Sequence, residues 1–205
     1  MRFDRQPPAP HPRPLSASAS DEELAQRFVG GERRAYDLLA DRYLRPLYNF
    51  AFRLLGNAAD AEDVTQETLV QLYQHLPALQ TDQPIRPWLY RVARNRCLDL
   101  LRRRRSTPLS ELASPESEED APEPSVVDPT PLPEDLVERA DLQEILQAAF
   151  AALPDHYRQV VALRYTTDLT FAEMGAVLGL PENTVKTHFQ RAKGVLRERL
   201  RALVG

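Results

Sequence analysis

One stretch divides this chain and limits what it can fold into. From Ser106 to Glu138 there is no lysine or arginine, while aspartate and glutamate recur throughout. Prolines stand at positions 108, 115, 122, 124, 129, 131 and 133. Proline fixes φ and lacks a backbone donor, so this spacing prevents regular helix or sheet, and the composition is typical of an extended or disordered segment. We therefore predict an acidic, proline-rich linker over residues 106–134 with a folded block on each side.

The linker also accounts for the overall charge. The chain has 26 Lys and Arg against 30 Asp and Glu, a net charge of −4, which by itself argues against binding to phosphates. Without the linker the two blocks are no longer acidic, and each ends in a basic segment. These segments contain Arg86, Arg91, Arg94, Arg96 and residues 102–105 in the first block, and Lys186, Arg191, Lys193, Arg197, Arg199 and Arg201 in the second. A single basic run usually marks a solvated face, but two such runs favour a polyanionic partner.

Both blocks have the pattern of helices, with few glycines and no sustained alternation of apolar and polar residues. Ser20 and Glu23 form a capping-box pattern that starts a helix near Asp21, which should stop by residue 30. A helical stretch over residues 32–55 should be bent or restarted at Pro46, and a further helix should cover 58–76. We predict an all-α fold of two small helical domains.

The helix that follows Pro87 has two different faces. Apolar residues recur at steps of three and four, at Trp88, Leu89, Val92, Ala93, Cys97, Leu100 and Leu101. We expect this stripe to face the core. The opposite face is predicted to carry Tyr90, Arg91, Arg94, Asn95 and Arg102.

The second block contains the pattern of a helix-turn-helix. Thr170 and Glu173 form a capping box, Gly179 is suited to a left-handed helix stop, and Pro181 is well placed to open the next helix. In that helix Val185, Phe189, Ala192 and Leu196 predict a buried stripe. The residues expected to face outward are Asn183, Thr184, Lys186, Thr187, Gln190, Arg191 and Lys193. Such side chains reach base edges and phosphates in a major groove, although an ordinary surface helix of a small bundle is the alternative.

Other features point to an intracellular setting without cofactors. Cys97 is the only cysteine, so no intrachain disulfide is possible, and no Cys/His cluster has metal-ligand spacing. Residues 1–19 are polar and proline-rich, which predicts a disordered extension rather than a signal peptide, and no run approaches ~20 apolar residues. We expect a soluble, cytoplasmic protein with no membrane insertion, no metal and no cofactor.

The two blocks resemble the extracytoplasmic-function (ECF) group of sigma factors. Residues 31–43 are similar to the opening helices of the family. Residues 63–69, DVTQETL, are similar to its D-x-x-Q-E-x-F signature, with leucine where phenylalanine is common. This helix grips the clamp of RNA polymerase in the family. The resemblance therefore implies core-polymerase contacts by Asp63, Gln66, Glu67 and Leu69.

Residues 88–95, WLYRVARN, resemble the family's W-L-Y-R-I-A-x-N segment, which contacts the minus-ten element and holds bases pulled out of the duplex. The implied minus-ten residues are Tyr90, Arg91, Arg94, Asn95, Arg102 and Arg103. Asn95 is the expected base reader, while Trp88 is expected in the core. Residues 171–193 resemble the minus-thirty-five reader, which assigns that role to the outward residues of the second helix. Gly175 replaces the usual alanine and His188 a common arginine.

The resemblance implies four segments and a function in transcription. These are an extension over 1–19, sigma domain two over 20–105, the linker over 106–134, and sigma domain four over 135–205. The expected partners are core RNA polymerase, through its beta-prime clamp and beta flap, promoter DNA, and an anti-sigma protein of the kind that holds many members inactive. The chain would direct promoter-specific initiation and perform no covalent chemistry.

Two other functions are compatible with parts of the sequence. A conventional helix-turn-helix regulator would use the second block alone and bind duplex DNA tightly without polymerase. An enzyme such as a nuclease would need paired carboxylates beside a base or a metal cluster, and we find no such arrangement in the sequence.

Overall fold

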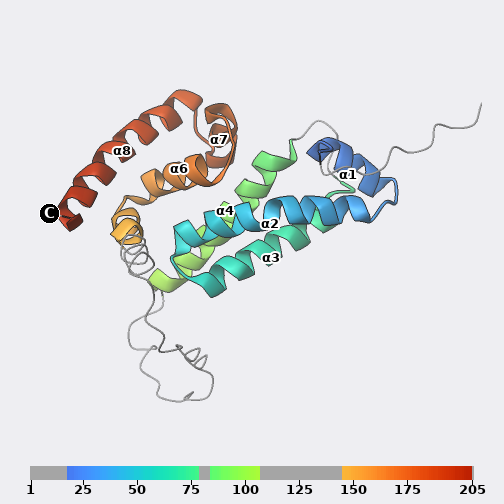
Figure 1. The fold of residues 1–205 in the computed structure, drawn as a ribbon, viewed down its shortest axis with the longest axis horizontal. Coiled ribbons are helices and arrows are strands. Elements are labelled where there is room, and N and C mark those ends of the chain that lie inside the picture. Colours follow the sequence, from blue (N-terminus) through green and yellow to red (C-terminus); the bar gives the residue numbers. More distant parts are fainter. Residues whose placement is uncertain (1–17, 79–83, 107–144, 205) are drawn as a thin grey trace, which may run out of the picture.

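The computed structural model describes residues 18–78, 84–106 and 145–204. Within these ranges the regular elements are helices, and the all-α prediction is confirmed (Figure 1). They are α1 Asp21–Val29, α2 Arg34–Leu55, α3 Ala58–His75, α4 Ile85–Ser106, α6 Asp155–Thr166, α7 Phe171–Leu178 and α8 Glu182–Val204. A helical segment over 145–151 precedes α6. Residues 1–17 of the predicted extension and 107–134 of the predicted linker lie outside the described residues.

The ends of the first helices follow from their capping residues. The Ser20 side chain accepts a hydrogen bond from the Glu23 N–H at 3.1 Å, and the Asn57 side chain accepts one from the Asp60 N–H at 2.9 Å. Gly56 closes α2 with φ of 67°, a left-handed conformation that glycine adopts without strain. Of the two alternatives expected at Pro46, a bend or a restart, the restart is wrong, because α2 continues through the proline. Buried residues before and after the proline hold both halves of α2 against the same core.

The first domain is a bundle in which α2 packs against α1, α3 and α4. Asp21 fastens its N-terminal end. The buried Asp21 carboxylate accepts hydrogen bonds from the Arg42 guanidinium and from the Tyr43 hydroxyl, and Arg86 Nη2 lies 3.9 Å from it. One carboxylate thus links α1 to α2 and α4. Because a buried charge is stable only with such partners, this cluster specifies how the three helices meet.

The second domain places α7 and α8 on either side of a short turn, with α6 packed against α8. The capping box of α7 is complete: the Thr170 N–H donates to Glu173 Oε2 at 2.8 Å, and the Glu173 N–H donates to Thr170 Oγ1 at 3.2 Å. Gly179 ends α7 with φ of 69°. These are the start and stop that the sequence predicted for the helix-turn-helix.

The two domains pack directly on each other. Helix α6 lies against α2, and α7 lies against α4 (Figure 1). The buried apolar side chains of both domains form one continuous cluster. One expectation is wrong: Tyr90 was predicted on the outer face of α4 but is only 2% exposed, and its ring packs against Phe50 of α2. Helix α4 is covered from two sides, by the first domain and by α6 and α7, so its buried surface is wider than the apolar stripe.

Candidate nucleic-acid interface

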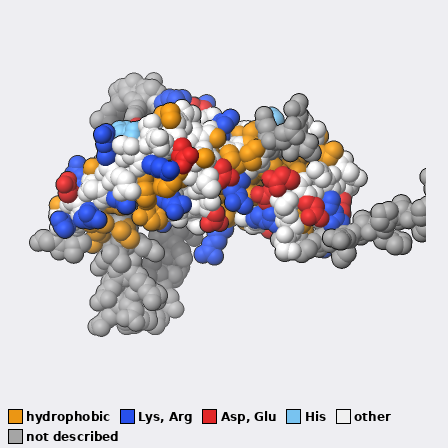
Figure 2. Space-filling view, turned by 90° about the horizontal axis from the view of Figure 1, so that it is seen from above, with side chains coloured by type: hydrophobic (Ala, Val, Ile, Leu, Met, Phe, Trp, Pro, Cys, Tyr) orange, Lys and Arg blue, Asp and Glu red, His pale blue; other side chains and the backbone are white. Residues whose placement is uncertain are grey.

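Helix α8 presents the polar face that the sequence assigned to it. Val185, Phe189 and Ala192 are buried beneath it. Of the seven predicted contact residues, Asn183, Lys186, Thr187, Gln190 and Arg191 are exposed, while Thr184 and Lys193 are half-buried. In the view from the side of α8, Lys and Arg are more frequent than Asp and Glu among the charged side chains (Figure 2). The second domain therefore offers one cationic helix face to solvent.

Two lysines of this face make weak contacts with neighbouring side chains. Lys186 Nζ lies 2.6 Å from Glu182 Oε1, one turn earlier on α8, and 6.0 Å from the centre of the Phe171 ring. Lys193 Nζ lies 5.0 Å from the centre of the Phe189 ring. Exposed contacts of this kind are weak and are exchanged at little cost for a phosphate.

His188 points away from this face. Its ring lies 5.2 Å from that of His156 and 5.7 Å from that of Tyr157, both on α6. Partial burial lowers the pKa of His188, with further lowering by His156 and Arg191. The ring therefore favours its neutral form and packs between α6 and α8, so the position does not replace the charge of an outward arginine.

On α4 the predicted minus-ten residues have different surroundings. Asn95, Arg102 and Arg103 are exposed, and Arg102 Nη1 lies 2.7 Å from Asp99 Oδ1. Tyr90 packs edge-on against Phe50, with ring centres 5.5 Å apart, and burial raises its pKa well above the usual range. Thus Tyr90 is inaccessible in this arrangement.

The two remaining residues of this set, Arg91 and Arg94, contact the second domain. Arg91 Nη2 donates to the Ala176 carbonyl oxygen on α7 at 2.7 Å. Arg94 Nε donates to Gln159 Oε1 on α6 at 2.5 Å. Desolvation lowers the pKa of Arg94, with Arg102 as a smaller contributor.

The predicted polymerase-contact residues lie on α3. Asp63 and Gln66 are exposed. Glu67 Oε2 accepts from Arg96 Nε of α4 in an ion pair of 2.6 Å. Leu69 is 8% exposed, so its side chain packs inside the domain, and its carbonyl oxygen accepts the Tyr36 hydroxyl at 3.0 Å.

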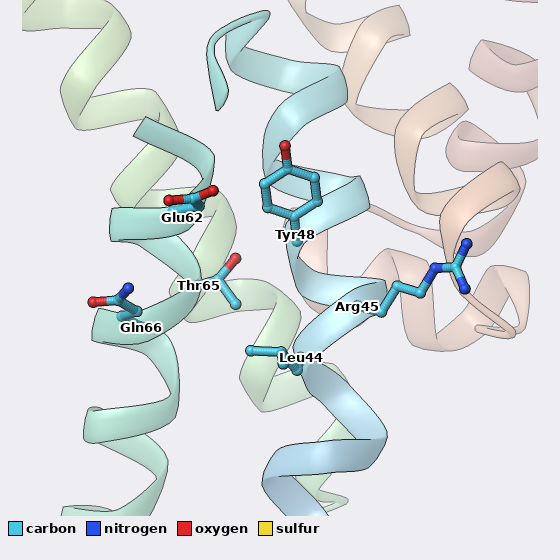
Figure 3. A pocket seen from close by; sticks show the side chains of 6 residues that line it. All are labelled: Leu44, Arg45, Tyr48, Glu62, Thr65 and Gln66. Atoms are coloured by element: carbon cyan, nitrogen blue, oxygen red, sulfur yellow. The ribbon is translucent and has the colours of Figure 1, made fainter. Parts of the chain in front are cut away.

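A shallow pocket beside Gln66 adds residues that the sequence motif did not reveal. It has a volume of about 320 Å³ and lies between α2 and α3 (Figure 3). Leu44, Arg45 and Tyr48 of α2 line it together with Glu62, Thr65 and Gln66 of α3. Leu44 is 51% exposed. In the sequence Leu44 stands one helical turn before Tyr48, which also lines the pocket, and this pair was the available signal.

Within the described ranges no group of three His, Cys, Asp or Glu residues could hold a metal ion. No helix of those same ranges is long and apolar enough to cross a membrane.

Comparison with known proteins decides the family. The sigma-70 region 2 profile matches residues 39–107, and the sigma-70 region 4 profile matches residues 143–196. The ECF RNA polymerase sigma factor SigW of Bacillus subtilis is 32% identical over 173 residues, which cover 84% of this chain and 92% of the relative. The chain belongs to the ECF sigma factors. Like other members of this family of non-catalytic initiation factors, it directs promoter-specific transcription by RNA polymerase, with core polymerase and promoter DNA as partners.

Other relatives agree with this assignment. The ECF sigma factor SigE of Mycolicibacterium smegmatis is 34% identical over 168 residues, covering 81% of this chain and 62% of the relative. The solved structure of CnrH in complex with the cytosolic domain of CnrY has a TM-score of 0.66 and 25% identity, and the match covers 89% of this chain and 97% of CnrH. The conventional helix-turn-helix regulator, weighed above, finds no support in these similarities.

Proposed function

We propose that this sigma factor divides promoter recognition between two helix faces. The exposed face of α8 reads duplex DNA at the minus-thirty-five element, and α4 captures unpaired bases at the minus-ten element. The observation that carries the proposal is the pair of cationic faces on separate domains, one on the second helix of a complete helix-turn-helix and the other on α4 within the region 2 match.

The seven residues of the α8 face suit a major groove. Asn183, Thr187 and Gln190 offer amides and hydroxyls for base edges, and Lys186 and Arg191 offer charge for phosphates or guanine. The half-buried Thr184 and Lys193 flank this surface. In contrast, His188 is turned toward α6 and has no place in the contact set.

For α4 we propose that Asn95 reads an unpaired base while Arg91, Arg94, Arg102 and Arg103 neutralise the backbone. Stacking on an aromatic side chain is worth roughly 1–3 kcal/mol per base, comparable with the few kcal/mol that unstacking requires. Tyr90 would serve as such a platform only after a rearrangement that exposes its ring, because it is buried against Phe50 of α2.

Core polymerase is proposed to dock on α3 and on the pocket between α2 and α3. Asp63 and Gln66 supply an acidic, amide-rich rim, and Leu44 and Tyr48 supply apolar contact beside it. This composition suits a partner helix with basic and apolar residues. Leu69 supports α3 from inside, and Glu67 acts through its ion pair with Arg96.

The decisive experiment is run-off transcription with purified core polymerase on duplex promoters. Lys186→Ala and Arg191→Ala should each lower the promoter-specific transcript roughly ten-fold, the effect of removing one groove or phosphate contact of ~1–3 kcal/mol. Arg199→Ala is the matched control, since Arg199 is an exposed arginine of α8 outside the proposed face. Unchanged transcript in both variants would refute the choice of recognition face.

A second experiment separates base capture from duplex reading. Asn95→Ala should lower transcription from duplex promoters more than from promoters pre-opened at the minus-ten element. Equal loss on the two templates would be consistent with base reading by Asn95 but would contradict its role in melting.

We also propose that the protein acts in the cytoplasm, where its polymerase is, and that an anti-sigma protein regulates it. The support for a regulator is the similarity to CnrH, which was solved with the cytosolic domain of CnrY bound. Co-purification of the chain with one stoichiometric partner that blocks run-off transcription would test this. If all of the protein purified from its native cell extract were fully active in run-off transcription, the proposed regulation would be contradicted.

A further inference from the structure

The two lysines of this sequence stand on the same helix. Of its 26 lysine and arginine residues only Lys186 and Lys193 are lysines, and both belong to the α8 face. Every other cation assigned to the two DNA-facing surfaces is an arginine. The chemistry that is open to side-chain amines is therefore confined to the helix proposed to read the duplex.

A lysine amine and a guanidinium differ in the reactions that they can undergo. A guanidinium stays protonated at physiological pH, whereas a lysine amine can lose its proton and attack an activated acyl group. Acylation converts the cation into a neutral amide and removes its contacts with aromatic faces. Acylation can thus remove positive charge from α8 and leave the arginines of α4 as they are.

Lys193 lines an open pocket of the second domain. The pocket has a volume of about 600 Å³ and lies where the end of α6, the segment between α6 and α7, and α8 meet. The other lining residues supply a guanidinium, a carboxylate, hydroxyls and an aromatic ring, and they are Arg164, Tyr165, Thr167, Asp168 and Phe189. A guanidinium beside an amine and hydroxyls suits a small anion that carries a reactive group.

Arg164 and Lys193 are suited to different parts of such a ligand. The exposed Arg164 guanidinium lies 5.2 Å from the centre of the Phe171 ring, and Lys193 Nζ lies 5.0 Å from the centre of the Phe189 ring. Among the described residues no carboxylate lies within ion-pair distance of either cation. Arginine binds phosphate through its planar fork of donors, which leaves the Lys193 amine for the acyl carbon.

Lys186 differs from Lys193 in both respects. Its Nζ lies 2.6 Å from Glu182 Oε1, and Lys186 does not line the pocket. The amine must leave this ion pair before it can attack an acyl group. We therefore expect Lys186 to react more slowly than Lys193.

We propose that Lys193 is a modification site, acylated by a small acyl phosphate whose phosphate group is held by Arg164, and that this modification weakens duplex binding by α8. The neutral Lys193 amine attacks the carbonyl carbon and a C–N bond forms. The C–O bond to the phosphate breaks with its electron pair on the leaving phosphate, which also takes the amine proton. The products are an amide and inorganic phosphate. The effect on DNA binding rests on the proposed function above, whereas the site itself does not.

Acetyl phosphate is the probe of the site. The full chain is incubated with it, and acetylation of the two lysines is followed by peptide mass spectrometry. Lys193 should react at least about three-fold faster than Lys186, within the range expected from the loss of one exposed ion pair. Arg164→Gln should lower the ratio of the two rates, whereas Arg199→Gln, at an exposed position of α8 outside the pocket, should not. Circular dichroism of both variants should match the wild-type helix signal.

Two further measurements test the class of acyl donor. Inorganic phosphate should slow the reaction of Lys193 with acetyl phosphate, because it competes for Arg164. Acetyl coenzyme A carries the same acetyl group on sulfur, without a phosphate beside the carbonyl, so Arg164→Gln should not change its ratio of rates. The same dependence on Arg164 with both donors would contradict the phosphate anchor.

Binding of a short random-sequence duplex to the full chain measures the consequence. At an exposure that modifies mainly Lys193, affinity should fall roughly three- to ten-fold, and the slope of log K against log salt should fall by about 1, because one phosphate contact is lost. Lys193→Arg presents a cation that cannot be acylated. The same treatment should therefore leave its affinity equal to that of its own untreated sample.

Equal acetylation rates at the two lysines, or a ratio that is independent of Arg164, would overturn the proposed site. Unchanged duplex binding after acetylation of Lys193 would overturn its regulatory role, provided that Lys186→Ala and Arg191→Ala lower run-off transcription. Failure of the proposed function has a different signature. In that case Lys193 is acetylated preferentially and with the help of Arg164, but run-off transcription stays insensitive to the two alanine variants.

Discussion

Gly175 lies where α7 approaches the turn that leads to α8. A Cβ added to it would lie 2.6 Å from the Leu180 carbonyl oxygen, a separation that real side chains avoid. From the sequence, this glycine is expected to weaken its helix by roughly 1 kcal/mol relative to alanine. The helix propensity of alanine would favour Gly175→Ala, but the structure predicts the opposite, because the Leu180 carbonyl oxygen lies too close to leave room for a Cβ.

We therefore expect Gly175→Ala to destabilise the protein by about 1–3 kcal/mol, the usual cost of overpacking. Gly194→Ala is the control: Gly194 is within α8, and an added Cβ would meet nothing within 4 Å, so it should stabilise by about 0.5–1 kcal/mol. Urea unfolding of the three proteins measures both effects. Stabilisation by Gly175→Ala would contradict the close contact.

Tyr90 and Tyr43 make stability sensitive to alkaline pH. Burial raises the pKa of both hydroxyls above the ordinary value of about 10. The stability that depends on their neutral forms is complete below that ordinary pKa and is lost as pH rises through the folded-state pKa. The unfolded chain releases these protons first, so unfolding becomes easier above about pH 10.

Tyr90→Phe should leave the unfolding free energy at neutral pH nearly unchanged and reduce its decline above about pH 10, because one buried hydroxyl no longer titrates. Chemical unfolding across this alkaline range measures the decline. Tyr165→Phe is the control, since Tyr165 is 61% exposed. An identical decline in the Tyr90 variant and the wild type would show that Tyr90 does not contribute.

At the scale of elements, the stability of α7 depends strongly on its capping interactions, because the helix is short. It has only eight residues, too few to be stable alone in water. Its first turn is held by the reciprocal bonds of Thr170 and Glu173, and its last by Gly179 and by Arg91 from α4. The orientation of α8 follows from this short helix, because the turn joins them directly.

Thr170→Ala should cost about 1 kcal/mol of stability, the usual value of an N-cap, whereas Thr170→Ser should retain nearly all of it. Thermal unfolding of the two variants gives the comparison. Duplex binding should fall with the alanine variant and not with serine, because a frayed α7 loosens the support of α8. Equal stability of the two variants would mean that the cap contributes little.

At the scale of the whole molecule, the two domains share one buried cluster. Two separate cores joined only by a linker would unfold independently, but a shared core couples them. Trp88, the only tryptophan, lies on α4 of the first domain and so reports on that domain alone. The helical circular dichroism signal reports on both.

The free protein should therefore unfold with the same midpoint by Trp88 fluorescence and by circular dichroism, as two-state coupling requires. Gln159→Ala should separate the two midpoints, because it weakens the contact between α4 and α6. Distinct midpoints already in the wild type would show that the shared cluster does not couple the domains.

Much of the fold and of the candidate site could be predicted from sequence. Ser20, Asn57, Thr170 and Gly179 mark helix ends because capping acts within a few residues and needs no distant partner. The outward face of α8 follows from the helical period. Val185, Phe189 and Ala192 recur at steps of three and four and face the core, so most of the residues between them face solvent.

What only the tertiary structure decided are the features that depend on residues far apart in the chain. The burial of Tyr90, the engagement of Arg91 and Arg94, and the pocket beside Leu44 arise where one helix meets another from a different part of the sequence. The sequence by itself determined two helical domains of a sigma factor, each with a basic segment. Their mutual packing was decided by tertiary structure, because a periodic pattern records one buried face of a helix, and α4 has two.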